Sequence, residues 1–396
     1  MANKHHVALL IETSRAYGRG LCQGVARFAR ERGDMVLFTQ EQDIPKALPA
    51  WVRRWHGDGI LARIHNPEIA AELKSLGVPV VDLLGRELYD GIPLMTPDPR
   101  GIAAMAVRFF LNAGFERFAF CGYPSISFSE RRCEAFVERL KEEGFPCLCY
   151  RPPAGFRPDI LNPEPAGDKH GLHLLRWLKS LPKPIAIFAC NDVRGQRILS
   201  ICAENGILVP EEVSVMGVDN DDVLCNLTNP PLSSVDPNAE EIGYRAAALL
   251  ETLMSGAPLP DPMLMEIPPK ELVERTSTDT VAVSDPATAK ALRFIRLNAY
   301  SGGVSAHSVV DVVGISRTSL DERFKLHLGR SISDELMRVR LQRVKSLLRE
   351  TELPLPKIAR LSGFFTASHL CVAFRRAHKQ TPGEYRKSAS QQNKDS

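Results

Sequence analysis

Polar side chains that could bind a ligand follow several strand-like stretches of this chain. In open parallel sheets, ligands bind at the carboxyl ends of the strands. The candidate residues carry guanidinium, phenol, amide and carboxylate groups, and they are Arg15, Tyr17, Arg19, Arg132, Asn191, Asp192 and Asp219. A polyol needs paired donors and acceptors at its hydroxyls, and an aromatic face covers its C–H side. These residue types favour a sugar-binding cleft, although each one alone is more often a salt-bridged or helix-capping residue.

The elements that must position these side chains alternate along the first 275 residues. The predicted strands are 7–11, 35–39, 59–64, 78–83, 117–121, 185–189 and 213–218, and the predicted helices between them are 20–30, 67–76, 100–113, 130–142, 172–181, 195–204 and 239–254. Such alternation predicts parallel sheets with helices on both faces. So many units crowd a single sheet, and we therefore predict an α/β domain of two lobes with a cleft between them.

Beyond residue 286 the pattern becomes purely helical and contains a first helix-turn-helix. Residues 308–313 form its supporting helix, Gly314 supplies the turn, and Ser316 caps the next helix. Leu320 and Phe324, spaced i and i+4, should pack inward. The residues that then face outward are Arg317, Thr318, Ser319, Asp321 and Glu322 for base edges, and Arg323 and Lys325 for phosphates.

A second helix-turn-helix follows the same plan. Its supporting face is Ile358, Ala359 and Leu361, its turn is Gly363, and Leu370 and Phe374 repeat the inward pair. The predicted DNA-facing residues are Thr366, Ala367, Ser368, His369 and Val372, with Arg375 and Arg376 on the phosphate backbone. The helix predicted over 333–350 would hold the two readers in successive major grooves of double-stranded DNA. An all-helical dimerisation domain is the alternative interpretation.

Charge supports a DNA partner for the C-terminal part. Residues 281–396 carry 20 Lys+Arg and 10 Asp+Glu, a net charge of +10, whereas residues 1–280 carry 30 and 37, a net charge of −7. A basic domain joined to an acidic one is the electrostatic pattern of a DNA-binding module with a different partner domain.

Residues 287–387 resemble the DNA-binding domain of AraC-type transcription regulators. The resemblance depends most on Gly363-Phe364, Phe374-Arg375-Arg376, Thr381-Pro382 and Glu384-Tyr385-Arg386. Pro354 and Pro356 depart from that family, which usually has Ser or Thr before an Ile at this point.

Residues 5–275 resemble the sugar-binding domain of LacI/GalR regulators, which is itself similar to periplasmic sugar-binding proteins. Arg132 matches the arginine of the Arg-x-x-(Gly/Ala)-Phe motif, Asn191-Asp192 the Asn-Asp pair, and Asp219 the Gly-(Phe/Tyr/Val)-Asp motif. Residues 231–235 match the Pro-Pro-Leu-(Thr/Ser)-(Thr/Ser)-Val segment. The N-terminal helix-turn-helix and hinge helix of that family are absent.

The whole chain resembles the xylose operon regulators, in which a LacI/GalR-like sugar-binding domain precedes an AraC-type DNA-binding domain. The sequence segments that support this resemblance are Arg15-Ala16-Tyr17 and residues 274–279, 284–287 and 313–317. The resemblance implies an activator with D-xylose as effector that forms a homodimer. A contact with RNA polymerase is a further expected interaction. A regulator that responds to another pentose or hexose, a sugar-processing enzyme and a soluble sugar-binding protein are the alternatives.

We expect four segments: a sensing domain at 1–275, a linker at 276–286, a DNA-binding domain at 287–390 and a disordered tail at 391–396. No apolar run reaches the roughly 18 residues of a membrane span, and the start has no signal-peptide layout. Nine scattered cysteines without a C-x-x-C pair fit reduced thiols in a cytoplasm.

Enzyme motifs are incomplete in this sequence. The glycines of 18–24 are spaced G-x-G-x-x-x-G, which misses the dinucleotide pattern G-x-G-x-x-G. Neither a phosphate-binding G-x-x-x-x-G-K, a G-x-S-x-G nor an H-E-x-x-H motif occurs. Asp221 and Asp222 are adjacent, so they cannot be the separated acid and base of a glycosidase. We therefore expect no catalytic residue, no cofactor and no metal.

Overall fold

The structure, a computed structural model, describes residues 4–40, 47–85, 87–156, 168–279, 283 and 285–392. Its contacts divide the chain into two compact units, Met1–Thr280 and Val281–Ser396. The division falls where the net charge changes sign, inside the predicted linker. Among the helices of these ranges, none is long and apolar enough to cross a membrane.

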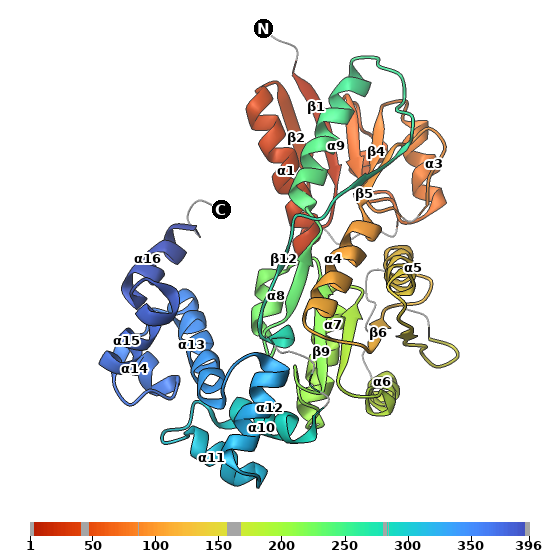
Figure 1. The fold of residues 1–396 in the computed structure, drawn as a ribbon. Coiled ribbons are helices and arrows are strands. Elements are labelled where there is room, and N and C mark those ends of the chain that lie inside the picture. Colours follow the sequence, from red (N-terminus) through yellow and green to blue (C-terminus); the bar gives the residue numbers. More distant parts are fainter. Residues whose placement is uncertain are drawn as a thin grey trace. The chain divides into compact units, whose positions relative to one another are not determined.

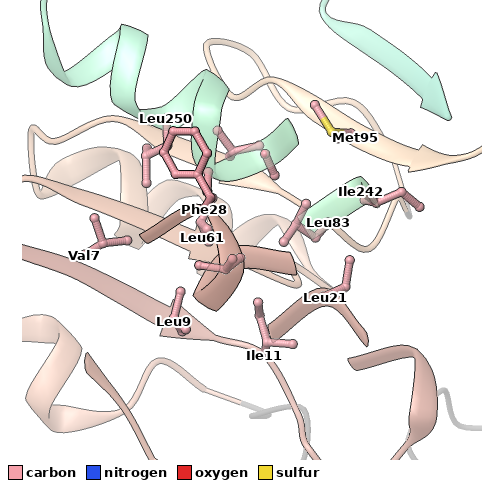
Figure 2. Close-up of a cluster of buried hydrophobic side chains, with 14 of the residues drawn as sticks. Val7, Leu9, Ile11, Leu21, Phe28, Leu61, Leu83, Met95, Ile242 and Leu250 are labelled. Atoms are coloured by element: carbon pink, nitrogen blue, oxygen red, sulfur yellow. The ribbon is translucent and has the colours of Figure 1, made fainter. Parts of the chain in front are cut away.

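The first lobe of the first unit is a parallel six-stranded sheet of order β11-β5-β4-β3-β1-β2. Its strands are β1 (His5–Leu10), β2 (Met35–Thr39), β3 (Gly59–Ala62), β4 (Val80–Asp82), β5 (Leu94–Pro97) and β11 (Leu264–Ile267). Its helices are α1 (Ala16–Arg32), α2 (Ala50–Arg53), α3 (Pro67–Ser75) and α9 (Ala239–Met254). Figure 2 shows one face of this sheet, where Leu9 and Leu61 meet Leu21 of α1 and Leu250 of α9 in a buried cluster.

The second lobe has another six-stranded sheet, of order β12-β10-β9-β8-β6-β7. Its strands are β6 (Phe118–Cys121), β7 (Cys147–Cys149), β8 (Ile185–Ala189), β9 (Val213–Val218), β10 (Ser233–Asp236) and β12 (Glu271–Val273). Only β12 of these described strands runs antiparallel, against β10. The helices are α4 (Pro99–Asn112), α5 (Ser127–Glu142), α6 (Asp168–Ser180), α7 (Asp192–Glu204) and α8 (Asp222–Leu227).

Within the described ranges, the chain passes between the lobes at three places: from β5 to α4, from β10 to α9, and from β11 to β12 (Figure 1). Both central strands β8 and β9 are buried at every residue, as strands covered by helices on two faces must be. The predicted two-lobed fold with parallel sheets is confirmed.

The second unit is all helical, as predicted. Its helices are α10 (Pro286–Asn298), α11 (Ala306–Val313), α12 (Arg317–Leu328), α13 (Ile332–Glu350), α14 (Leu355–Leu361), α15 (Ala367–His378) and α16 (Pro382–Gln392). The predicted inward pairs, Leu320 with Phe324 and Leu370 with Phe374, are fully buried. The turn glycines have the positive φ that glycine tolerates, 84° at Gly314 and 76° at Gly363.

Helix α13 belongs to both hydrophobic clusters of this unit. Its first half, with Val339, packs with α10, α11 and α12, and its second half, with Val344, packs with α14 and α15 (Figure 1). Between them, the buried Arg340 donates from Nε to the carbonyl oxygen of Ala299 at 2.8 Å and from Nη2 to that of Val304 at 2.7 Å. One helix therefore joins the two helix-turn-helix halves.

Two predicted boundaries need correction. Thr276–Thr278 form a turn of 3₁₀-helix whose Ser277 and Thr278 are buried against β9 and β10, because Ser277 donates to Val215 O and accepts from Ser233 N. These residues belong to the first unit and not to a linker. Helix α16 continues to Gln392, so the predicted tail begins inside a helix, and its residues 393–396 lie outside the described ranges.

Candidate functional site

A cleft between the two lobes lies where both sheets reverse their strand order. In the first lobe β1 is flanked by β2 and β3, and in the second β6 is flanked by β7 and β8, so each sheet has a switch point there. The cleft holds about 570 Å³ of empty space, including its open mouth. Its lining comes from both lobes and consists of Glu12, Arg15, Tyr17, Arg63, Leu84, Thr96, Pro97, Phe128, Arg132, Asn191 and Asp219.

Five of the seven predicted sugar-binding residues line this cleft, namely Arg15, Tyr17, Arg132, Asn191 and Asp219. Arg19 does not. Its guanidinium donates to the carbonyl oxygens of Thr13 and Ser14 at 3.0 and 2.9 Å and lies 3.6 Å from Asp221. Arg19 therefore braces the loop that follows β1.

Asp192 is buried beneath the cleft and does not line it. Its carboxylate accepts a hydrogen bond from the Ser234 hydroxyl at 2.6 Å and another from the backbone N–H of Asp221 at 2.8 Å. Burial, and then the nearby charge of Asp219, raise the pKa of Asp192 to about 8. Asp192 therefore holds the loop after β9, while its neighbour Asn191 reaches the cleft.

Arg132 and Asp219 form the charged pair of the second lobe. Arg132 Nη1 donates to the carbonyl oxygen of Cys190 at 2.5 Å, and Nη2 lies 3.5 Å from Asp219 Oδ1. The same guanidinium lies over the ring of Phe128, 5.3 Å from its centroid. Asp219 has a φ of 111°, a conformation that is costly for a residue with a side chain and is typical of functional sites. Burial raises the pKa of Asp219, and the charge of Arg132 opposes that rise.

The first lobe contributes a second charged pair, which the sequence analysis missed. Glu12 and Arg63 form an ion pair, and Arg63 lies 5.2 Å from the centroid of the Tyr17 ring. Burial lowers the pKa of Arg63 to about 10. Below them the buried Asp82 accepts from the backbone N–H groups of Ile64 and Leu84, and burial raises its pKa to about 6. The missed residues had a signal, since Glu12, Arg63 and Leu84 each follow closely on a strand.

Tyr17 has an unusual hydroxyl. The oxygen is buried, and no hydrogen-bond partner for it exists among the described residues. Burial also raises its pKa, so the phenol stays neutral and can donate. A buried hydroxyl without a partner costs roughly 1–3 kcal/mol, which a ligand that pairs with it recovers.

Gly18 fixes how closely α1 approaches the end of β1. A Cβ atom there would lie 1.9 Å from the carbonyl oxygen of Glu12 and 3.2 Å from its Cδ. Only glycine allows this contact, and the contact holds Glu12 at the cleft wall.

Helix α12 of the second unit exposes most of the residues predicted to read DNA. Arg317, Thr318, Glu322, Arg323 and Lys325 are exposed and Ser319 is half-buried. Three of the predicted residues form contacts within the unit. Asp321 accepts from the backbone N–H of Ile332 at 3.0 Å and lies 3.7 Å from Nε of Arg317, and Arg323 forms an ion pair with Asp285.

Helix α15 has a similar exposed face. Thr366 caps the helix by accepting from the backbone N–H of His369 at 3.1 Å, and Ala367 is half-buried. The exposed residues are Ser368, His369, Val372, Arg375 and Arg376. Phe365, just before the cap, is 82% exposed, and the sequence analysis did not single it out. A large apolar ring this open suggests a contact surface.

A two-lobed binding unit with a polar cleft, followed by a unit with two helix-turn-helix motifs, defines the class of transcription regulators that respond to a small molecule. Family models agree with this division. Residues 6–90 match the XylR N-terminal domain, residues 107–278 a periplasmic binding protein-like domain and residues 309–388 a helix-turn-helix domain.

The chain belongs to the family of xylose operon regulatory proteins. It is 31% identical to the xylose operon regulatory protein of Escherichia coli K12 over 97% of both chains, and 28% identical to that of Haemophilus influenzae over 96% of this chain and 98% of the other. The solved structure of the xylose-binding transcription activator XylR matches with a TM-score of 0.80 and 30% identity, over 98% of this chain and 99% of that one.

Proposed function

We propose that the chain is a D-xylose-responsive transcription activator that binds the sugar in the cleft between its lobes. The observation that carries the proposal is the buried hydroxyl of Tyr17, which lacks a partner among the described residues and lies in a cleft of paired charges. A neutral polyol satisfies such groups without upsetting the charge balance of Glu12 with Arg63 and of Arg132 with Asp219. The choice of xylose rests on the family.

The contacts follow from the hydrogen-bonding capacity that each residue retains. Asn191 Oδ1 accepts from the backbone N–H of Arg194 at 3.0 Å, so the amide group turns its N–H donors to the ligand. Asp219 accepts from two sugar hydroxyls, and Arg132 and Arg15 donate to hydroxyl or ring oxygens. Phe128 and Tyr17 supply aromatic surface for the C–H side of the sugar.

A thermal melt of the full chain with D-xylose, L-arabinose, D-ribose and D-glucose tests the choice of effector. A sugar at 100 times its dissociation constant stabilises the folded state by about 2.7 kcal/mol, which raises the melting temperature by a few degrees. We expect this shift with D-xylose. A shift with another sugar alone would replace the effector and keep the cleft, and the absence of any shift would contradict sugar binding.

The sugar acts on transcription through the relative position of the lobes. It contacts residues on both sides of the cleft, so it binds the closed arrangement more tightly and shifts the population towards it. The three connections between the lobes are the hinges. DNA affinity with and without D-xylose measures the coupling, and equal affinities combined with equal transcription would refute it.

The DNA contacts are proposed on the exposed faces of α12 and α15. Arg317, Thr318 and Glu322 read bases from α12, while Arg375 and Arg376 contact phosphates from α15. Asp321 and Arg323, whose partners Ile332 and Asp285 lie outside α12, position α12 instead. Phe365 supplies the apolar contact for thymine methyl groups.

The remaining partners are a second copy of this chain, which pairs two DNA readers, and RNA polymerase. Sedimentation of the full chain with operator DNA tests the dimer. Catalysis is not part of the proposal, and incubation with D-xylose should return the sugar unchanged.

A further inference from the structure

Three of the nine cysteines lie together at the edge of the second lobe, away from the lining of the cleft. Cys147 and Cys149 are two residues apart on β7, so their side chains point to the same face of the sheet. Helix α5 contributes Cys133, whose Sγ lies 3.7 Å from the Sγ of Cys149. All three cysteine residues are half-buried.

The three sulfurs are not equivalent. Either sulfur can donate in the contact between Cys133 and Cys149. Hydrogen bonding with Cys133 and Cys147, together with the charge of Arg151, lowers the pKa of Cys149. The same hydrogen bonds and burial raise the pKa of the other two thiols. A thiolate in an electropositive, partly exposed position is the form of cysteine that reacts with oxidants.

We propose that Cys149 and Cys133 form a modification site for hydroperoxides, in which Cys149 is oxidised first and Cys133 then closes a disulfide. The Cys149 sulfur attacks the O–O bond, takes one oxygen as a sulfenic acid and releases the other as an alcohol, or as water from hydrogen peroxide. The Cys133 sulfur then attacks the Cys149 sulfur, an S–S bond forms and the hydroxyl leaves as water. Two thiols are oxidised while one hydroperoxide is reduced.

Cys133 is the neighbour of Arg132, and this connects the thiols to the cleft. Arg132 is fixed by the Cys190 carbonyl and by Asp219, and Phe128 lies one turn earlier on the same helix. A disulfide brings the two sulfurs from 3.7 Å to about 2.0 Å, which draws α5 towards β7. The position of Arg132 changes with the helix, and the oxidised protein therefore binds the effector more weakly. This coupling rests on the proposed function, whereas the disulfide chemistry does not.

Peptide mass mapping of the reduced full chain, exposed to hydrogen peroxide, tests the site. We expect a peptide that links Cys133 to Cys149, the loss of two thiols per chain and reversal by dithiothreitol. Cys133→Ser should stop at a sulfenic acid on Cys149 that dimedone traps, and Cys149→Ser should remove the fast reaction. Cys22→Ser is the matched control, because Cys22 is also a half-buried thiol but lies on α1.

Intact thiols after treatment, a Cys147–Cys149 link, or equal oxidation of Cys22 and Cys149 would overturn the proposal. Each of these outcomes is measured on the wild-type protein, so the disulfide proposal can be tested even if a variant does not fold. Calorimetry with D-xylose then compares oxidised and reduced protein, and we expect a several-fold weaker affinity after oxidation. An unchanged affinity would overturn the coupling to the cleft, and no binding by the reduced protein would overturn the proposed function.

Discussion

The substitution Tyr17→Phe should stabilise the protein without sugar and weaken the complex with sugar. The hydroxyl of Tyr17 is buried without a partner among the described residues, which costs roughly 1–3 kcal/mol of folding free energy. Phenylalanine removes that cost and keeps the ring under Arg63, whose guanidinium lies 5.2 Å from the ring centroid. The free energy of unfolding in urea should therefore rise by about 1–3 kcal/mol.

In the complex the same change removes the partner of a sugar hydroxyl. A buried sugar hydroxyl then lacks a hydrogen bond, at a cost of about 1–3 kcal/mol, and calorimetry with D-xylose should show a dissociation constant raised roughly 5- to 150-fold. The matched control is Tyr244→Phe, since the Tyr244 hydroxyl on α9 donates to Glu31 of α1 at 2.7 Å, in an exposed contact outside the cleft lining. That variant should keep the wild-type affinity. A Tyr17→Phe protein that is less stable without sugar, or that binds xylose normally, would refute the reasoning.

Three other predictions follow from the same geometry. The pKa of the Asp192 carboxyl group is about 8 in the folded protein and about 3.9 in the unfolded chain, so between these pH values only the folded protein keeps the proton. The free energy of unfolding should therefore fall as the pH rises from about 4 to about 8. Asp192→Asn should flatten that decline in urea titrations at several pH values. Gly18→Ala places a Cβ 1.9 Å from the Glu12 carbonyl oxygen and should cost about 1–3 kcal/mol in the same assay, with weaker xylose binding; wild-type values would show that α1 yields easily. Arg376→Ala should weaken DNA binding equally across sequences and lower the salt slope by about one in fluorescence titrations, whereas a sequence-selective loss would indicate a base contact.

The fold was predictable where residues form long buried runs. Strands such as β8 and β9 are apolar throughout, and the helices between strands show one apolar face, so their positions followed from periodicity. The strands that were missed, β5, β7, β10, β11 and β12, have only three or four residues each. Three of them, β7, β11 and β12, also lie at sheet edges, where Leu148 and Leu264 are exposed. Such strands exist through pairing with partners that are distant in sequence, and local composition does not encode that pairing.

The cleft was predictable by residue type and strand end, but not by side-chain direction. Asn191 and Asp192 are adjacent, yet one reaches the cleft and the other lies beneath it, because Asn191 is the extended N-cap residue of α7 and Asp192 is the first residue in the helix. Arg15 is the extended N-cap residue of α1 and lines the cleft, whereas Arg19 lies inside the helix and braces a loop. Glu12 and Arg63 were missed because their pairing joins two strands across a switch point.

The continuity of α13 has a consequence for the promoters that this regulator can recognise. Its residues complete both hydrophobic clusters, and Arg340 locks its middle to the loop before α11, so neither reading helix can be moved along it separately. The distance between the two reading helices is therefore fixed within the protein. One base pair inserted between the two recognised stretches would turn the second by about 35° around the duplex, and the rigid helix could not follow. With the DNA contacts proposed for α12 and α15, the base sequence that this protein recognises can vary, but the spacing between the two contacted stretches is set by α13.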